Sequence, residues 1–158
     1  MDIKKLLRSI WRKICTIIRR ILAERIERSW KVHLFLKTYA PLTPIYLADN
    51  EYEILSKDEL EELVKKTYRR VKDFLKKYKL EDCDCDDWAA AFYFFAKVKS
   101  IRAIGIAWSI KHAFIVSIAY CDGKPELLVI EPQTSKIYTY YEAIKMDLYK
   151  PRWRFVLM

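Results

Sequence analysis

Glycine is nearly absent from this sequence, with two glycines in 158 residues. Because glycine is the residue that most readily adopts left-handed backbone, this low count indicates stiff elements joined by few special turns. The apolar residues near the N-terminus form no long run, since Arg or Lys interrupts them every three or four positions. We therefore expect neither a signal peptide nor a transmembrane segment, and we expect a cytoplasmic location.

Cysteine is also scarce, with four residues in the chain. A chain of this length can form its own hydrophobic core and does not need a disulfide framework, so reduced thiols are expected. Hydrophobic residues make up 53% of the sequence and aromatic residues 15%, which excludes a disordered chain. The length fits one domain.

Positive charge is concentrated at the N-terminus. Residues 1–31 contain ten Lys or Arg against three acidic residues, whereas the rest of the chain is close to neutral. Apolar residues recur there every three or four positions, which predicts a basic amphipathic helix over 1–31. Such a helix could pack on the domain, form a homodimer, or bind nucleic acid or an anionic membrane surface. Residues 32–158 are expected to form a single α+β domain.

Two helices are predicted in the middle of the chain. Residues 37–55 resemble a connector with one short strand at 45–47. A helix then begins at Ser56, which forms the pattern of a capping box with Glu59. Its charged outer face is more typical of a solvated surface than of a nucleic-acid groove. A further helix over 87–97 is apolar on all sides and is expected to be buried.

Short apolar runs typical of strands follow these helices. They cover 103–110, 113–120, 127–131, 137–141 and 153–157. Asp122-Gly123 lies between the second and third runs and predicts a tight hairpin. Helices followed by an antiparallel sheet indicate an α+β fold.

Cys85 lies at the polar start of the apolar helix. Unpaired backbone N–H groups at a helix N-terminus lower the pKa of a thiol, which favours a nucleophile at this position. The neighbouring Asp84, Asp86 and Asp87 oppose this effect, because negative charge disfavours a thiolate. A Ca²⁺ or Mg²⁺ ion bound by these aspartates would offset their charge. Cys83 and Cys85 without a second ligand pair match zinc-site spacings poorly.

A base and an orienting group occur in the strands that follow. His112 begins one apolar run, and a thiol nucleophile requires such a base. Glu131 ends the next run, where its carboxylate could orient the imidazole, and Gln133 could donate to substrate or to an oxyanion. A strand histidine and an Asp-rich helix start are each often structural. Their occurrence together, in this order, favours a catalytic site.

Several motifs resemble a known family of thiol enzymes, the papain-like or transglutaminase-like cysteine proteases. They are Cys85-Asp86-Asp87-Trp88-Ala89, Gly105-Ile106-Ala107-Trp108, His112-Ala113, Ile130-Glu131-Pro132-Gln133-Thr134 and residues 153–158. The region from 80 to 158 looks like a domain of small phage and archaeal-virus proteins. It is also similar to the calcium-dependent protease domain of a mushroom agglutinin. The resemblance implies Cys85 as nucleophile, His112 as base, Glu131 as orienting carboxylate, and Asp86 and Asp87 as calcium ligands.

Three functions are consistent with these observations. The first is a thiol hydrolase or acyltransferase that acts on a polypeptide or another amide, in the host cytoplasm if the protein is viral. The second is a nuclease in which Asp84, Asp86, Asp87 and Glu131 hold Mg²⁺. The third is a catalytically inactive module that binds DNA, a membrane surface or a partner through residues 1–31.

Overall fold

The computed structural model describes residues 26–77, 83–98, 100–150 and 153–158. The amphipathic helix predicted for 1–31 therefore lies mostly outside the described residues. Its last part is not continuous helix, because β1 (Ile26–Arg28) is a strand that pairs antiparallel with β3 (Glu51–Glu53). Helix α2 (Ser29–Tyr39) begins directly after β1.

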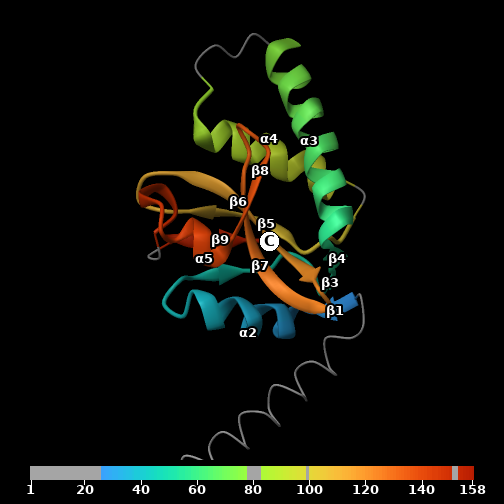
Figure 1. Cartoon of the computed structure of the whole chain (residues 1–158), viewed down its shortest axis with the longest axis vertical. Helices are drawn as coiled ribbons and strands as arrows, with labels where there is room; N and C mark the ends of the chain where they lie inside the picture. The colour runs from blue at the N-terminus through green and yellow to red at the C-terminus, as the bar shows by residue number, and fades with distance from the viewer. Residues whose placement is uncertain (1–25, 78–82, 99, 151–152) are drawn as a thin grey trace, which may run out of the picture.

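A seven-stranded sheet forms the centre of the fold (Figure 1). Its main path runs in the order β2 (Ile45–Tyr46), β9 (Phe155–Leu157), β5 (Ile104–Trp108), β6 (Ala113–Cys121), β7 (Lys124–Glu131) and β8 (Lys136–Thr139). The pairs from β9 to β8 are antiparallel, and β4 (Leu55–Ser56) pairs with β6 in parallel. Each of the five predicted apolar runs overlaps a strand, and the α+β class is confirmed. The sheet was expected to be antiparallel, but it is mixed, because β2 pairs with β9 and β4 with β6 in parallel.

The hairpin between β6 and β7 turns at Asp122 and Gly123, as predicted. Both residues have positive φ, 50° and 72° respectively. Two consecutive left-handed residues match the right-handed twist of antiparallel strands, and Asp and Gly are residue types that tolerate this conformation.

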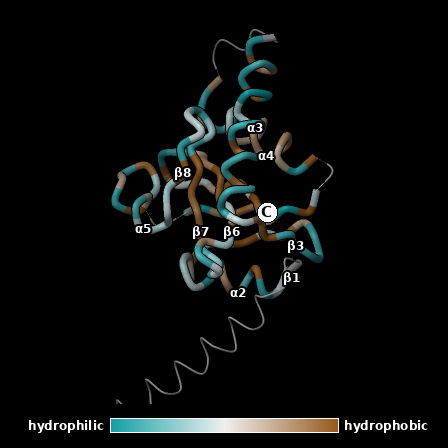
Figure 2. Tube along the Cα trace, turned by 45° about the vertical axis from the view of Figure 1, so that its right-hand side comes forward, coloured by the Kyte–Doolittle hydropathy of each residue, from teal (hydrophilic) through white to brown (hydrophobic). Residues whose placement is uncertain are grey.

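Helices cover both faces of the sheet. On one face lie α3 (Lys57–Lys77) and α4 (Cys85–Lys97), in a core that includes Ile115 of β6. On the other face lie α2, α5 (Tyr140–Ala143) and the 3₁₀ turn η1 (Asp147–Tyr149), in a core that includes Phe114. Successive strand residues point to opposite faces and helices cover both, so the buried stretches 113–119 of β6 and 127–130 of β7 are apolar except at Ser117 (Figure 2).

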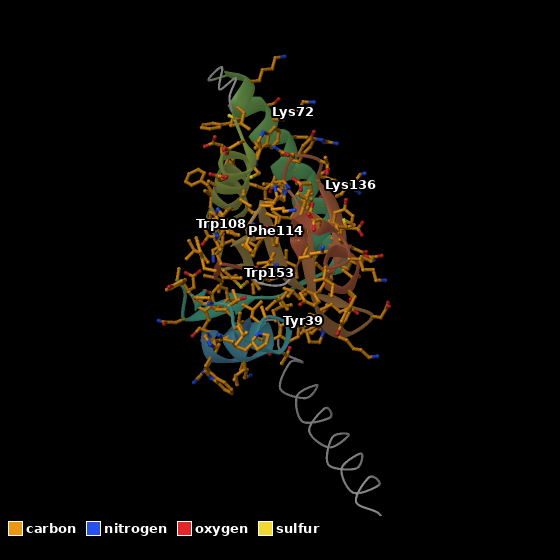
Figure 3. The ribbon with its side chains drawn as sticks, turned by 90° about the vertical axis from the view of Figure 1, so that its left-hand side faces the viewer. Tyr39, Lys72, Trp108, Phe114, Lys136 and Trp153 are labelled. Atoms are coloured by element: carbon orange, nitrogen blue, oxygen red, sulfur yellow. The ribbon has the colours of Figure 1, made fainter. Side chains whose placement is uncertain are left out.

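Figure 3 shows the aromatic residues Phe114 and Trp153 inside the molecule and the charged residues Lys72 and Lys136 at its surface. The rings of Phe114 and Trp153 meet edge to face at 5.3 Å. This aromatic core lies beneath the loop that carries His112, whose ring stacks 6.3 Å from that of Phe114. The described helices include none that is both long and apolar enough to cross a bilayer.

The two central helices were located correctly from the sequence, but the burial of the second was not. The Ser56 capping box is present, with Ser56 N–H donating to Glu59 Oε2 at 2.9 Å and Glu59 N–H donating to Ser56 Oγ at 3.3 Å. Helix α4 was expected to be buried on all sides. That expectation is wrong, because Phe92 is fully buried but Phe94 is 61% exposed.

Candidate functional site

The first turn of α4 places Cys85 against the start of β6. Asp84 caps the helix, because its side chain accepts the N–H of Asp86 at 3.2 Å. Cys85 is the first helical residue, and its sulfur accepts the backbone N–H of Ala113 at 3.5 Å. The apolar underside of α4 packs on β5 and β6, so this contact joins the helix start to the strand start.

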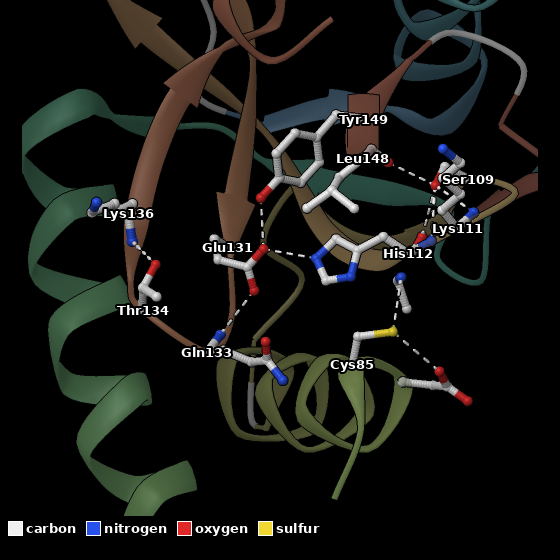
Figure 4. Close-up of polar contacts among 12 residues, drawn as sticks. Cys85, Ser109, Lys111, His112, Glu131, Gln133, Thr134, Lys136, Leu148 and Tyr149 are labelled. Atoms are coloured by element: carbon white, nitrogen blue, oxygen red, sulfur yellow. Dashed lines mark hydrogen bonds and ion pairs between the residues drawn. The ribbon is translucent and has the colours of Figure 1, made fainter. Parts of the chain in front are cut away.

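Strand register brings His112 and Glu131 together. Ile115 pairs with Ile130, so Phe114 lies opposite Glu131. His112 precedes Phe114 by two residues and therefore points to the same face as Glu131. The His112 Nε2 lies 2.7 Å from Glu131 Oε2. In Figure 4 the imidazole lies between Glu131 and Cys85, with its other nitrogen on the Cys85 side.

Glu131 is a buried carboxylate with three donors. Its Oε2 also accepts the hydroxyl of Tyr149 at 2.6 Å, and its Oε1 accepts the backbone N–H of Gln133 at 3.1 Å. Burial alone would raise the pKa of Glu131, but the hydrogen bonds from His112, Tyr149 and Gln133 outweigh it and lower the pKa. The carboxylate is therefore ionised at neutral pH.

This ionisation determines how His112 is protonated. An ionised carboxylate can only accept a hydrogen bond, so the Nε2 of His112 must carry a proton. In the neutral ring the Nδ1 then has the free lone pair, on the side of Cys85. The arrangement provides a base beside the sulfur.

The Cys85 thiol is protonated in the resting site. Burial raises its pKa most, the Ala113 N–H lowers it, and the Asp86 hydrogen bond and the charges of Asp86 and Asp84 raise it further. The thiol donates to Asp86 Oδ1 at 3.4 Å. The pKa of Cys85 is therefore raised, with burial as the largest cause and the neighbouring aspartates as smaller ones.

The three aspartates beside Cys85 are all exposed. Asp84 acts as the helix cap and Asp86 accepts from the thiol. Over the described ranges, no group of three or more His, Cys, Asp or Glu side chains is placed to hold a metal ion. A Ca²⁺ or Mg²⁺ role for Asp84, Asp86 and Asp87 stays an untested prediction.

Two residues that sequence reasoning missed complete the site. Ser109 Oγ accepts the N–H groups of Lys111 and His112 at 3.1 and 3.0 Å, and it lies 2.7 Å from the Leu148 carbonyl oxygen, to which it donates. Tyr149 follows Leu148 and reaches Glu131. A serine shortly before His112 is a recognisable turn signal. Tyr149 had no local signal, because its contact spans 18 residues.

Comparisons with known proteins give a likeness of fold. No family profile and no curated protein matches the chain. A structure described as the PSL1a–E64 complex matches with a TM-score of 0.60 and 17% identity, over 85% of this chain and 52% of the other. A Polyporus squamosus lectin bound to Neu5Aca2-6Galb1-4GlcNAc matches with a TM-score of 0.59 and 17% identity, over 85% and 50%.

The expected similarity to a mushroom agglutinin is thus confirmed as a shared fold, and this chain spans about half the length of the chains it matches. The expected assignment to the papain-like or transglutaminase-like cysteine proteases of phages and archaeal viruses is wrong. The likeness is instead to a lectin, because one of these two structures is that of a Polyporus squamosus lectin bound to a sialylated glycan.

Proposed function

We propose that Cys85, His112 and Glu131 carry out thiol-dependent acyl transfer at the carbonyl carbon of an amide or ester. The observation that carries this proposal is the 2.7 Å contact of His112 Nε2 with Glu131. It leaves the other ring nitrogen as a base on the side of Cys85, at the start of α4. A nucleophile, a base and a group that orients the base are the parts that this chemistry requires.

The reaction divides into two steps. The Cys85 S–H proton passes to the free nitrogen of His112 as the sulfur forms a bond to the carbonyl carbon and the carbonyl oxygen becomes an oxyanion. As the oxyanion collapses, the bond to the leaving group breaks and that group takes the proton from the imidazolium, leaving a thioester. Water or an amine then attacks the thioester as His112 takes its proton. The carbon–sulfur bond breaks, and the imidazolium returns the proton to the Cys85 sulfur.

Of the charges around the site, that of Glu131 favours the transition state, whereas those of Asp84 and Asp86 stabilise the neutral resting thiol. The raised pKa of Cys85 keeps the thiol neutral until the proton can pass to His112, and the ionised Glu131 stabilises the imidazolium that results. Backbone N–H groups in the first turn of α4 lack intrahelical acceptors and can donate to the oxyanion. The Gln133 side chain is a second candidate donor, because its backbone is fixed by the bond to Glu131.

Acetylation by p-nitrophenyl acetate tests the proposal on the full chain. We expect a burst of p-nitrophenolate and an acetyl group on Cys85, both lost in Cys85→Ala. In His112→Gln the burst rate should fall at least about a hundredfold, since general-base catalysis contributes this much or more. Cys121 is the internal control, because it lies at the far end of β6 from His112 and is also half-buried. Acetylation of Cys85 no faster than that of Cys121 would refute the proposal.

A second probe follows from the comparisons. E64, an epoxide electrophile, is named as the ligand of one structure that shares this fold. Mass spectrometry of the peptides after E64 treatment should locate its adduct on Cys85, with the adduct lost in His112→Gln. Modification of Cys121 at an equal rate would show that E64 modifies any accessible thiol, with no contribution from His112.

Glycan binding is a second candidate function, favoured by the lectin structure bound to Neu5Aca2-6Galb1-4GlcNAc. Calorimetric titration of this trisaccharide into the full chain tests it, with asialo trisaccharide as the control. Heat that saturates only with the sialylated compound would support glycan binding, and it should persist in Cys85→Ala. The absence of heat at millimolar concentrations would remove this candidate.

The two other functions considered from the sequence stay predictions. A magnesium-dependent nuclease would need Glu131 as a ligand, yet both oxygens of this carboxylate already accept hydrogen bonds. Attachment to DNA, a membrane surface, a partner or a second copy through residues 1–31 concerns a segment largely outside the described residues.

A further inference from the structure

Tyr149 and His112 meet at one oxygen atom of Glu131. The Tyr149 hydroxyl donates to Oε2 at 2.6 Å, and the His112 Nε2 lies 2.7 Å from the same atom. The Tyr149 side chain is buried, and its ring meets the His112 ring edge to face at 5.6 Å (Figure 4). Tyr149 therefore contacts both the base and the group that orients the base.

A buried carboxylate at the end of a strand needs donors on both oxygens to hold one rotamer. The Gln133 N–H occupies Oε1, so Tyr149 is the described donor besides His112 that determines where Oε2 lies. Burial raises the pKa of Tyr149 far above the usual tyrosine value, and Glu131 raises it further. The phenol therefore stays a donor throughout the pH range of enzyme chemistry.

Tyr149 is itself fixed to the loop that carries His112. The preceding residue, Leu148, accepts the Ser109 hydroxyl through its carbonyl, and Asp147 forms an ion pair with Lys111. On the other side, the indole N–H of Trp153 donates to the Tyr149 carbonyl at 3.2 Å. The turn η1 and the His112 loop therefore form one hydrogen-bonded unit.

We infer that Tyr149 is a positioning residue of the acyl-transfer site, which sets the Glu131 carboxylate so that His112 presents its free nitrogen to Cys85. This inference rests on the proposed function for its kinetic consequence, but the geometric part can be tested without any turnover. Tyr149 does not touch the reacting atoms, and it acts through Glu131.

Tyr149→Phe removes the hydroxyl and retains the ring. Glu131 then loses one of the hydrogen bonds that favour its ionised form, so its pKa should rise. The carboxylate can rotate, and His112 should populate both neutral tautomers. The rate of Cys85 acetylation should fall about tenfold, the effect of one charge-assisted hydrogen bond. The concentration of ester at half-saturation should not change, because Tyr149 does not contact the substrate.

Tyr138→Phe is the matched control. Its ring lies 6.0 Å from that of Tyr149 at a tilt of 43°, so it removes a phenol hydroxyl from the same aromatic group. We expect this variant to keep the wild-type His112 tautomer, Glu131 pKa and acetylation rate.

The experiment combines two independent readouts on the full chain. The ¹⁵N shifts of the His112 ring report the tautomer, and the ¹³C shift of the Glu131 carboxyl against pH reports its pKa. Changes in both for Tyr149→Phe, absent in Tyr138→Phe, support the inference even if no acetylation of Cys85 is seen, in which case the proposed function alone fails. Unchanged tautomer and carboxyl pKa in Tyr149→Phe would overturn the inference, even in a protein whose Cys85 is readily acetylated.

Discussion

The backbone N–H of Ala113 donates to the sulfur of Cys85 over 3.5 Å, and this contact joins the first residue of α4 to the first residue of β6. The sulfur is thereby held beside His112, the residue that precedes Ala113 in the chain. Cys85 and His112, the proposed nucleophile and base, are thus brought together by the packing of α4 on β6.

The charge of Asp86 should tune the thiol. Asp86 accepts from Cys85, and both this hydrogen bond and its charge raise the thiol pKa, after the larger effect of burial. Asp86→Asn should therefore lower the Cys85 pKa, seen as a lower pH midpoint for alkylation by iodoacetamide. Asp87→Asn is the control, because Asp87 is exposed in the same helical turn but is not among the groups that shift this pKa. Equal midpoints in both variants would contradict this assignment.

The ionised form of Glu131 should make stability depend on pH. The pKa of Glu131 is lowered in the folded protein from an ordinary value of 4.5. A lowered carboxyl pKa contributes stability that is fully present above the unfolded pKa and is lost as pH falls through the folded pKa. Urea unfolding from about pH 7 to about pH 3 should show this loss in the wild type. The decline should be shallower in Glu131→Gln.

Glu131→Gln should also be less stable than the wild type at neutral pH, by about 1–3 kcal/mol, because its amide cannot accept from all three donors. Glu51→Gln is a suitable control, since Glu51 lies exposed on β3. If the free energy of unfolding of Glu131→Gln falls with pH as steeply as that of the wild type, then other carboxylates cause the loss of stability in acid.

Gly105 lies where β5 meets the C-terminus. A Cβ atom added there would clash with the Leu157 carbonyl oxygen and lie 2.5 Å from Met158 Cγ. Gly105→Ala should reduce the free energy of unfolding by about 1–3 kcal/mol, because the strand backbone cannot move aside without breaking the β5–β9 pairing. Gly123→Asn is the control, since nothing lies within 4 Å of its Cβ and Asn tolerates a φ of 72°. Similar losses in both would argue against the close contact.

The Ser109 hydroxyl should stabilise the folded protein. Its buried hydroxyl serves two backbone N–H groups and the Leu148 carbonyl. Ser109→Ala leaves these groups without their partner, so unfolding measured in urea should become easier by about 1–3 kcal/mol. Ser135→Ala, which removes a hydroxyl bonded only to the adjacent Thr134 carbonyl among the described contacts, should have a much smaller effect.

Much of the fold and the main residues of the site could be predicted from the sequence, because both depend on local patterns. The capping box at Ser56, the Asp122-Gly123 turn and the short apolar runs each act through neighbouring residues. The sequence predicts one site for Cys85, His112 and Glu131, because a thiol at a helix start, a histidine before a strand and a glutamate after a strand can form a nucleophile, a base and a group that orients the base. The structure places His112 and Glu131 in direct contact.

The rest depends on tertiary contacts that no local pattern encodes. Residues 26–28 continue the apolar spacing of the segment before them, yet they pair with β3, which replaces helix by strand. Phe94 is apolar but lies outside the contact between α4 and the sheet. Tyr149 reaches Glu131 from a short turn with no motif of its own. The assignment to a protease family was wrong because short motifs can accompany a fold without showing which family of that fold the chain belongs to.

The most direct test of the central claim is the rate of iodoacetamide alkylation of Cys85 against pH, compared between wild type and His112→Ala, with Cys121 followed in the same digests. We predict that wild-type Cys85 is alkylated faster than Cys121 at neutral pH although its resting thiol is protonated, because His112 takes the thiol proton as the sulfur attacks, and that His112→Ala removes this difference. If Cys85 and Cys121 react alike, only at alkaline pH and independently of His112, then Cys85 is an ordinary buried thiol and the acyl-transfer proposal is wrong.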